Sequence, residues 1–153
     1  MPDEPWRASL DHALERNRLS PSHRFVQLAT IGLDGRPAVR TVVFRGFLGD
    51  SRELIFTTDA RSAKRTELER VPDAALCWYF AETREQFRFS GVVRLVDVST
   101  AEARFQEARR DVWRGLSNET RASFAWPTPG APRVREVAFP TTPPDPEDRK
   151  SVV

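Results

Sequence analysis

Five segments rich in β-branched and aromatic residues follow one another along the middle of this chain, separated by short turn sequences. They cover residues 25–31, 37–47, 53–58, 74–80 and 85–96. Asp34-Gly35, between the first two segments, is a strong signal for a hairpin turn. Several short antiparallel strands, interrupted by one helix over residues 62–69, are typical of a small barrel rather than an open sandwich. The sequence therefore predicts a mainly β domain with flanking helices.

Local signals place the helices and the irregular positions around these strands. Apolar residues recur at helical spacing within residues 4–18, which predicts a helix before the first strand. Ser99 and Glu102 have the spacing of a capping box, which predicts a second helix beginning beside them and a shorter one after it. Asp59 is expected to cap the helix over residues 62–69. Gly91 predicts a bulge that bends the last strand around the barrel.

The chain of 153 residues has the length of one domain. Residues 1–126 contain all the predicted strands and helices, so we expect them to form that domain. Seven of the twelve prolines fall after residue 126, and such a composition does not favour a packed core. Residues 127–153 are therefore predicted to form an extended or disordered tail.

Composition narrows the partners and the location. Hydrophobic residues make up 39% and charged residues 30%, as in ordinary globular proteins. No apolar run approaches the roughly 18 residues of a membrane span, and the N-terminus lacks the pattern of a secretion signal. The net charge of +2 is too small to indicate nucleic acid binding. We predict a cytoplasmic protein with neither a membrane nor a nucleic acid partner.

Histidine and cysteine are too few for the common metal sites and nucleophilic triads. The two histidines, His12 and His23, precede the first predicted strand, and Cys77 is the single cysteine. Spacings such as HExxH or CxxC do not occur. No metal ligand and no catalytic residue is therefore assigned.

Groups that can bind phosphate gather after the third predicted strand, in the segment FTTDARSAK. The strand ends in Thr57 and Thr58, and Arg61, Ser62 and Lys64 follow at the start of the predicted helix. A helix N-terminus favours an anion through its free N–H groups and its dipole. Two interpretations stay open: a phosphomonoester site, or an ordinary capped helix with solvated basic residues.

Polar residues within apolar strands supply further candidates. Arg40 and Arg45 lie in the second strand, where an arginine needs an anion or access to solvent. They are five residues apart, so strict alternation places them on opposite faces of the sheet. Gln86 in the last strand offers a donor and an acceptor, which suits the edge of a heteroaromatic ring; an exposed sheet face is the other explanation.

Taken in order, RTVVFRGF, IFTTDARSAK and REQFRFSG resemble the pyridoxamine 5′-phosphate oxidase-like FMN-binding split-barrel family. The resemblance covers about residues 23–126, and the later stretch ARRDVWRGLSNETRASFAWPTPG is similar to a subgroup described only as FMN-binding proteins. It implies a Greek-key-like split β-barrel that binds FMN. It also implies a homodimer with the flavin site at the subunit interface.

The resemblance gives the candidate residues roles. Arg40 matches the strand arginine that holds the FMN phosphate, and Ser62 and Lys64 match phosphate and flavin contacts at the helix start. Gln86 matches the glutamine that reaches the flavin ring, and Arg45 matches a basic residue that faces cofactor or substrate. The complete set of expected cofactor-binding residues is Arg40, Thr41, Val42, Arg45, Thr57, Thr58, Arg61, Ser62, Lys64 and Gln86.

Three departures from the family pattern limit what can be expected. Ala63 stands where the oxidases have a phosphate-binding arginine, for which Arg61 or Arg65 could compensate. Phe105 stands where they have a substrate-binding tyrosine, although Arg109 follows one turn later. Family members continue into further strands, whereas this chain ends in a polar tail, so we expect a barrel without the family's last strands.

The function expected from these features is that of an FMN-dependent oxidoreductase with an unidentified small-molecule substrate. A flavin ring carries out hydride transfer itself, while the protein binds and orients it. The electron donor is expected to be a molecule such as NAD(P)H. The alternative is a non-catalytic split-barrel module that binds flavin or haem.

Overall fold

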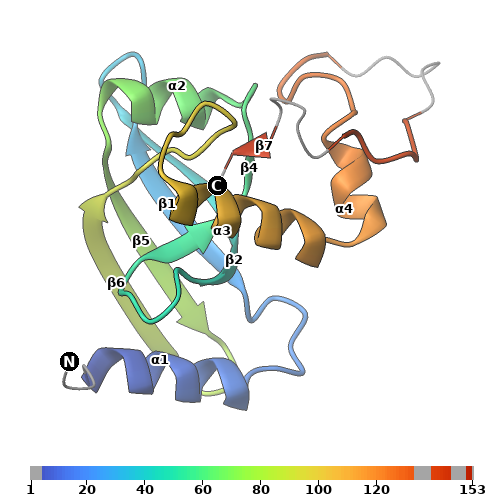
Figure 1. Cartoon of the computed structure of the whole chain (residues 1–153). Helices are drawn as coiled ribbons and strands as arrows, with labels where there is room; N and C mark the ends of the chain where they lie inside the picture. The colour runs from blue at the N-terminus through green and yellow to red at the C-terminus, as the bar shows by residue number, and fades with distance from the viewer. Residues whose placement is uncertain (1–4, 133–138, 146–150, 153) are drawn as a thin grey trace.

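A five-stranded antiparallel sheet is the largest element of the computed structural model, which describes residues 5–132, 139–145 and 151–152. The strand order is β3-β2-β1-β5-β6. The strands are β1 (Phe25–Ile31), β2 (Pro37–Phe47), β3 (Leu54–Phe56), β5 (Asp73–Phe80) and β6 (Glu85–Val92). The sheet curls into a half-barrel (Figure 1), so the predicted mainly β fold with flanking helices is confirmed.

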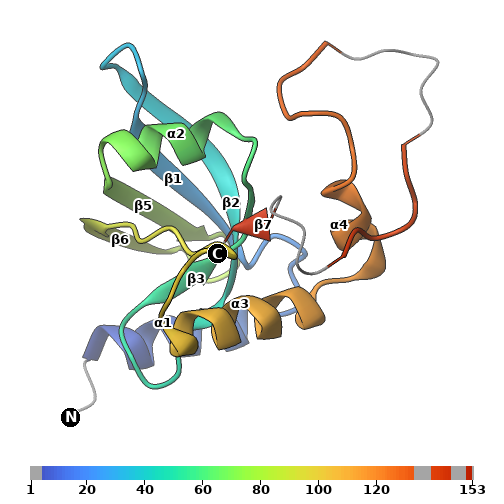
Figure 2. The same ribbon diagram turned by 45° about the horizontal axis from the view of Figure 1, so that its top comes forward.

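Four helices accompany the half-barrel in the part of the chain that the structure describes. They are α1 (Pro5–Arg16), α2 (Ala63–Arg70), α3 (Ala103–Gly115) and α4 (Asn118–Ser123). Helices α1 and α2 lie at opposite ends of the sheet, and α3 crosses in front of it (Figures 1 and 2). None of the described helices is both long and apolar enough to cross a membrane.

Alternation along the strands separates a buried inner face from an exposed outer face. The inner face and α1 together form the core, which consists of Leu10, Ala13, Val26, Leu28, Val42, Phe44, Trp78 and Phe80. Trp78 is fully buried, and its indole N–H donates to the carbonyl of His23 at 3.0 Å. The outer face leaves large apolar side chains in solvent, with Val39 70%, Tyr79 52% and Val92 74% exposed.

The bulge in the sheet lies in β2, not at Gly91. The β2–β3 register passes from Phe44 opposite Phe56 to Gly46 opposite Ile55, which leaves Arg45 as the extra residue. Gly46 has a φ of +143°, a conformation that favours glycine. Gly91 pairs regularly with Ala74, so the bulge predicted there is wrong.

The predicted capping box of α3 is wrong, and the predicted cap of α2 is confirmed in part. Helix α3 begins at Ala103, its N-cap residue is Glu102, and no side chain caps it. Ser99 lies outside the helix, and its hydroxyl donates to Asp97 at 2.6 Å. The Asp59 carboxylate accepts from the main-chain N–H of Arg61, two residues ahead, as predicted, but the N-cap residue of α2 is Ser62.

The end of the chain returns to the domain. Residues 127–132 and 139–145 contain no helix or strand, and the Trp126 indole donates to the carbonyl of Pro140 at 3.1 Å. Beyond them, β7 (Ser151–Val152) pairs with β4 (Thr58–Asp59), and this strand was not predicted. The rest of the predicted tail, at positions 133–138, 146–150 and 153, lies outside the described residues.

Candidate functional site

Two hydroxyls and a lysine meet where β4 leads into α2. A turn closed by the Ser62 N–H and the Asp59 carbonyl brings the helix start back toward the strand. The Lys64 ammonium donates to Thr58 Oγ1 at 2.7 Å, and Thr58 Oγ1 lies 3.2 Å from Ser62 Oγ. Thr57 Oγ1 is buried and has no hydrogen-bond partner among the described residues. The predicted cluster of hydroxyls and a cation at this helix start therefore forms.

Arg40 joins α2 from the inner face of β2. Its Nη2 donates to Glu67 Oε2 at 2.6 Å, and its Nη1 donates to Thr30 Oγ1. The Thr30 hydroxyl in turn donates to the same carboxylate oxygen at 2.6 Å. Side chains from β1, β2 and α2 thus close one hydrogen-bonded triad.

The Arg40 triad and the Lys64 cluster share one electrostatic environment. Burial lowers the pKa of Lys64, and the positive charge of Arg40 lowers it further. The carboxylates of Asp59 and Glu67 act in the opposite direction and raise this pKa. A region with two cations at short range, partly offset by acids, is suited to an oxyanion.

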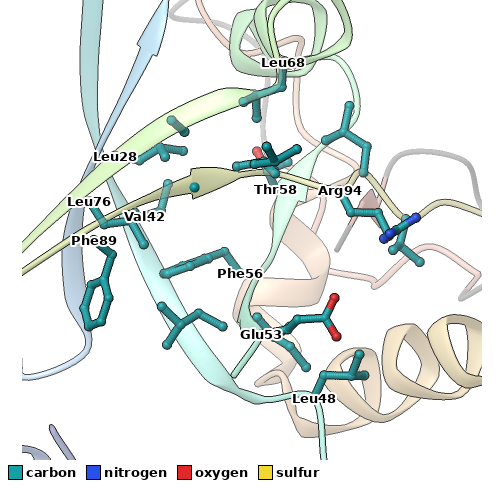
Figure 3. A pocket seen from close by; sticks show the side chains of 18 of the residues that line it. Leu28, Val42, Leu48, Glu53, Phe56, Thr58, Leu68, Leu76, Phe89 and Arg94 are labelled. Atoms are coloured by element: carbon teal, nitrogen blue, oxygen red, sulfur yellow. The ribbon is translucent and has the colours of Figure 1, made fainter. Parts of the chain in front are cut away.

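A cavity of about 360 Å³ opens beside this cluster, and Thr57, Thr58 and Lys64 form part of its wall. The rest of the wall is mainly apolar and includes Leu28, Val42, Phe56, Leu68, Leu76 and Phe89. Figure 3 shows these side chains around the cavity, with Glu53 and Arg94 as further polar groups. The cavity can therefore accept an apolar ring next to the cationic cluster.

Arg45 lies in a separate hollow of about 620 Å³ between the end of β2 and α3. Its other charged residues are Arg24, Arg104, Glu107 and Asp111. Burial lowers the pKa of Arg45, and the nearby charge of Arg24 lowers it further. Arg40 lines neither hollow, so the two arginines of β2 do not share one.

Arg61 and Arg65 are engaged by carboxylates. Arg61 pairs with Asp59 at 2.6 Å and donates to the carbonyl of Phe124 at 3.0 Å, which attaches the end of α4. Arg65 pairs with Glu69 at 2.7 Å and with Asp97 at 2.8 Å. Both guanidinium groups are thus already paired with carboxylates. Neither of them is a free donor that could replace the phosphate-binding arginine missing at Ala63.

The remaining predicted residues divide between the two faces of the sheet. Val42 is buried on the inner face and lines the cavity. Thr41 and Gln86 are exposed on the outer face, where Gln86 lies opposite Tyr79. A single chain thus assembles Arg40, Thr57, Thr58, Ser62 and Lys64, and leaves Thr41 and Gln86 on the other side.

Sequence analysis missed Thr30 and Glu67. Both are buried polar residues, at 2% and 6% exposure, in elements that were correctly predicted. Glu67 lies three residues after Lys64, a spacing that places both side chains on one face of a helix. In β1, every second residue points inward, and Thr30 follows Val26 and Leu28 in that series. A hydroxyl at an inward position was therefore a signal of a polar contact inside the fold.

A family model described as pyridoxamine 5′-phosphate oxidase, FMN-binding domain, matches residues 3–97. The chain belongs to this family.

Curated relatives agree with the assignment. Pyridoxine/pyridoxamine 5′-phosphate oxidase 2 of Arabidopsis thaliana is 43% identical over 128 residues, which cover 84% of this chain and 65% of the relative. The pyridoxine/pyridoxamine 5′-phosphate oxidase of Thermosynechococcus vestitus is 36% identical over 128 residues, covering 81% of this chain and 59% of the relative. The chain thus spans less than two thirds of either relative.

Solved structures extend the comparison to the fold. A pyridoxamine 5′-phosphate oxidase-related, FMN-binding protein of Nostoc punctiforme superposes with a TM-score of 0.91 and 46% identity, covering 99% of this chain and 80% of that protein. PhzG of Burkholderia lata, solved with tetrahydrophenazine-1-carboxylic acid, superposes with a TM-score of 0.71 and 24% identity, covering 99% and 76%. The half-barrel is therefore the FMN-binding split-barrel fold of this family.

Removing the charge of Arg40 is expected to raise the pKa of Lys64 part of the way back to its ordinary value. Arg40→Met deletes one cause of the lowered pKa, whereas burial, the larger cause, remains. A pH titration followed by the NMR signals of the lysine ε-methylene group measures the change. Arg65→Met is the control, because Arg65 lies on the same helix but is bonded to Glu69 and Asp97. An unmoved Lys64 titration in Arg40→Met would contradict the shared environment.

Proposed function

We propose that this chain binds FMN, with its phosphate at Arg40, Thr58, Ser62 and Lys64. The observation that carries the proposal is the meeting of a lysine and two hydroxyls at the start of α2, within the field of Arg40. Charge-assisted hydrogen bonds from such groups suit a phosphomonoester. The buried, unpartnered Thr57 hydroxyl supports the fit, because buried polar atoms in native proteins normally have a partner.

We further propose that the FMN-bound protein is an oxidoreductase that accepts electrons from a donor such as NAD(P)H. Bound FMN would supply hydride-transfer chemistry. The chain would hold the phosphate through its cationic cluster and exclude water through the apolar wall of the cavity. The names of the relatives, which are oxidases of pyridoxine and pyridoxamine phosphates, support the reaction class. Phe105, buried beneath Arg94 and Arg104, offers no hydroxyl to a substrate, so the organic substrate is left unassigned.

A homodimer is the third part of the proposal. Gln86 and Thr41 lie on the outer face, whereas the phosphate cluster lies on the inner side at α2. One flavin could use both groups only if a second copy presented its outer face to the first. The exposure of Val39, Tyr79 and Val92 supports such a contact, because large apolar side chains gathered on one face favour association. The cytoplasmic location predicted from the sequence stays a prediction.

FMN added to the purified protein is expected to bind, and Lys64→Met is expected to weaken binding about tenfold or more by removing a charged donor. Quenching of flavin fluorescence measures the Kd. Riboflavin, which lacks the phosphate, should bind Lys64→Met and the unchanged protein equally well. Arg65→Met is the matched control on the same helix, since its partners are Glu69 and Asp97.

Absence of any FMN-dependent signal would overturn the proposal. A parallel titration with haem tests the alternative module: saturable haem binding without FMN binding would favour that alternative.

Turnover is tested by mixing the FMN-loaded protein with NADH or NADPH under anaerobic conditions. We expect the visible absorbance of the flavin to bleach with at least one of the two donors, because an oxidoreductase must expose the ring to a reductant. Stopped-flow absorbance measures the rate. FMN binding without bleaching by either donor would instead support the non-catalytic flavin module.

Mixing two defective variants tests the shared site of the homodimer. Gln86→Ala keeps Lys64 and Lys64→Met keeps Gln86, so a mixed dimer would contain one site with both residues intact. After equal mixing and subunit exchange, roughly a quarter of all sites should recover tight FMN binding in a two-fold symmetric dimer. Titration before and after exchange measures the recovery, and sedimentation confirms the mass. No recovery from a dimeric mixture would contradict a site shared between copies.

A further inference from the structure

The partners of the Arg40 guanidinium are arranged on one of its edges. Thr30 Oγ1 accepts from Nη1 and Glu67 Oε2 accepts from Nη2, and these two oxygens lie only 2.6 Å apart. Two acceptors so close together can meet parallel N–H groups from both terminal nitrogens, as the two oxygens of a carboxylate do in a bidentate pair. The contacts of Nη1 with the carbonyls of Leu28 and Ala38 are longer, at 3.4 and 3.5 Å.

The opposite side of the guanidinium is open. Within residues 5–132, 139–145 and 151–152, no group accepts a hydrogen bond from Nε of Arg40. This nitrogen is also not among the fully buried polar atoms that lack a partner there, so it remains accessible. The Arg40 side chain is 22% exposed, against 8% for Glu67. A guanidinium carries five N–H donors in a fixed plane, so fixing the terminal edge also fixes the direction of the edge that contains Nε.

We infer that Glu67 and Thr30 are positioning residues that hold Arg40 by its terminal edge and so direct its Nε edge to the flavin phosphate. The inference rests on the proposed function, because it assumes that Arg40 receives the phosphate of FMN. Glu67 acts through Arg40 and does not itself contact the ligand.

The charge balance of the cluster agrees with this assignment. A carboxylate beside a phosphate site would oppose the anion unless a cation stood between them, and Arg40 is bonded directly to Glu67. Buried ion pairs often contribute little to folding stability, because the desolvation of both charges offsets their attraction. Orientation of Arg40 is therefore a better reason for a buried Glu67 than stability alone.

The test compares the Kd values of FMN and riboflavin for the full chain and four variants. The ratio of the two Kd values reports the contribution of the phosphate. In Glu67→Ala this preference for FMN is expected to fall about tenfold, the scale of one charge-assisted hydrogen bond, with riboflavin binding unchanged. Thr30→Val should lower the preference as well, because it removes the second acceptor. Glu67→Gln should stay within about threefold of the unchanged protein, since its amide oxygen can still accept from Nη2.

Glu69→Gln is the matched control on α2, because Glu69 pairs with Arg65 and not with Arg40. Its preference for FMN is expected to equal that of the unchanged protein. If Glu67→Ala does not fold, as judged by its thermal unfolding, Thr30→Val and Glu67→Gln carry the comparison.

The possible failures are distinguishable. An unchanged protein that binds neither flavin, or binds both equally, overturns the proposed function and this inference together. A protein that prefers FMN, combined with an undiminished preference in Glu67→Ala and Thr30→Val, overturns the inference alone. Equal weakening of FMN and riboflavin by these variants also overturns it, because that result assigns Glu67 and Thr30 to folding.

Discussion

The hydrogen bonding of β1 on both of its edges, to β2 and to β5, is the constraint on which the other parts of this structure depend. It fixes the register of the sheet, and with it the side to which each residue of three neighbouring strands points. Thr30 and Arg40 face inward because of that register, where they meet Glu67 of α2. A shift of β1 by one residue would turn Thr30 to the outer face and so remove it from Arg40 and Glu67. The hydrophobic core and the polar triad are thus specified by the same pairing.

Within the oxidase family fold, one chain offers two different chemical surfaces. The inner side carries cations and hydroxyls at α2 next to an apolar cavity, whereas the outer face carries amides and hydroxyls among exposed apolar side chains. Although a sheet is only one strand layer thick, its hydrogen-bonded strands leave no gap, so one ligand cannot contact both faces of the same sheet. The division therefore gives the proposed assembly of two copies a physical reason: groups on opposite faces of one sheet can meet only when a second sheet is present.

The sequence predicted the parts of this structure that depend on near neighbours. Strands β1, β2 and β5 follow from alternation, and Thr58, Ser62 and Lys64 meet because only a few residues separate them. Thr30 and Glu67 were missed because their contact with Arg40 exists only after three elements have packed. The bulge was placed at Gly91, since a glycine alone does not show which strand must accommodate an extra residue. The pairing of β4 with β7 uses main-chain groups and so leaves no residue pattern to detect.

The extra residue in β2 also makes possible one of the contacts between α1 and the sheet. Phe44 and Phe47 are three positions apart, a spacing that regular alternation would place on opposite faces. The bulge at Arg45 lets both rings pack together, with centroids 5.3 Å apart, and Phe47 also contacts Trp6 of α1 at 6.5 Å. The number of residues between Phe44 and Phe47 therefore matters in addition to which residues they are. The loss of one residue here would turn Phe47 away from Phe44 and Trp6, and would leave Phe89 as the aromatic partner of Trp6 at 5.3 Å.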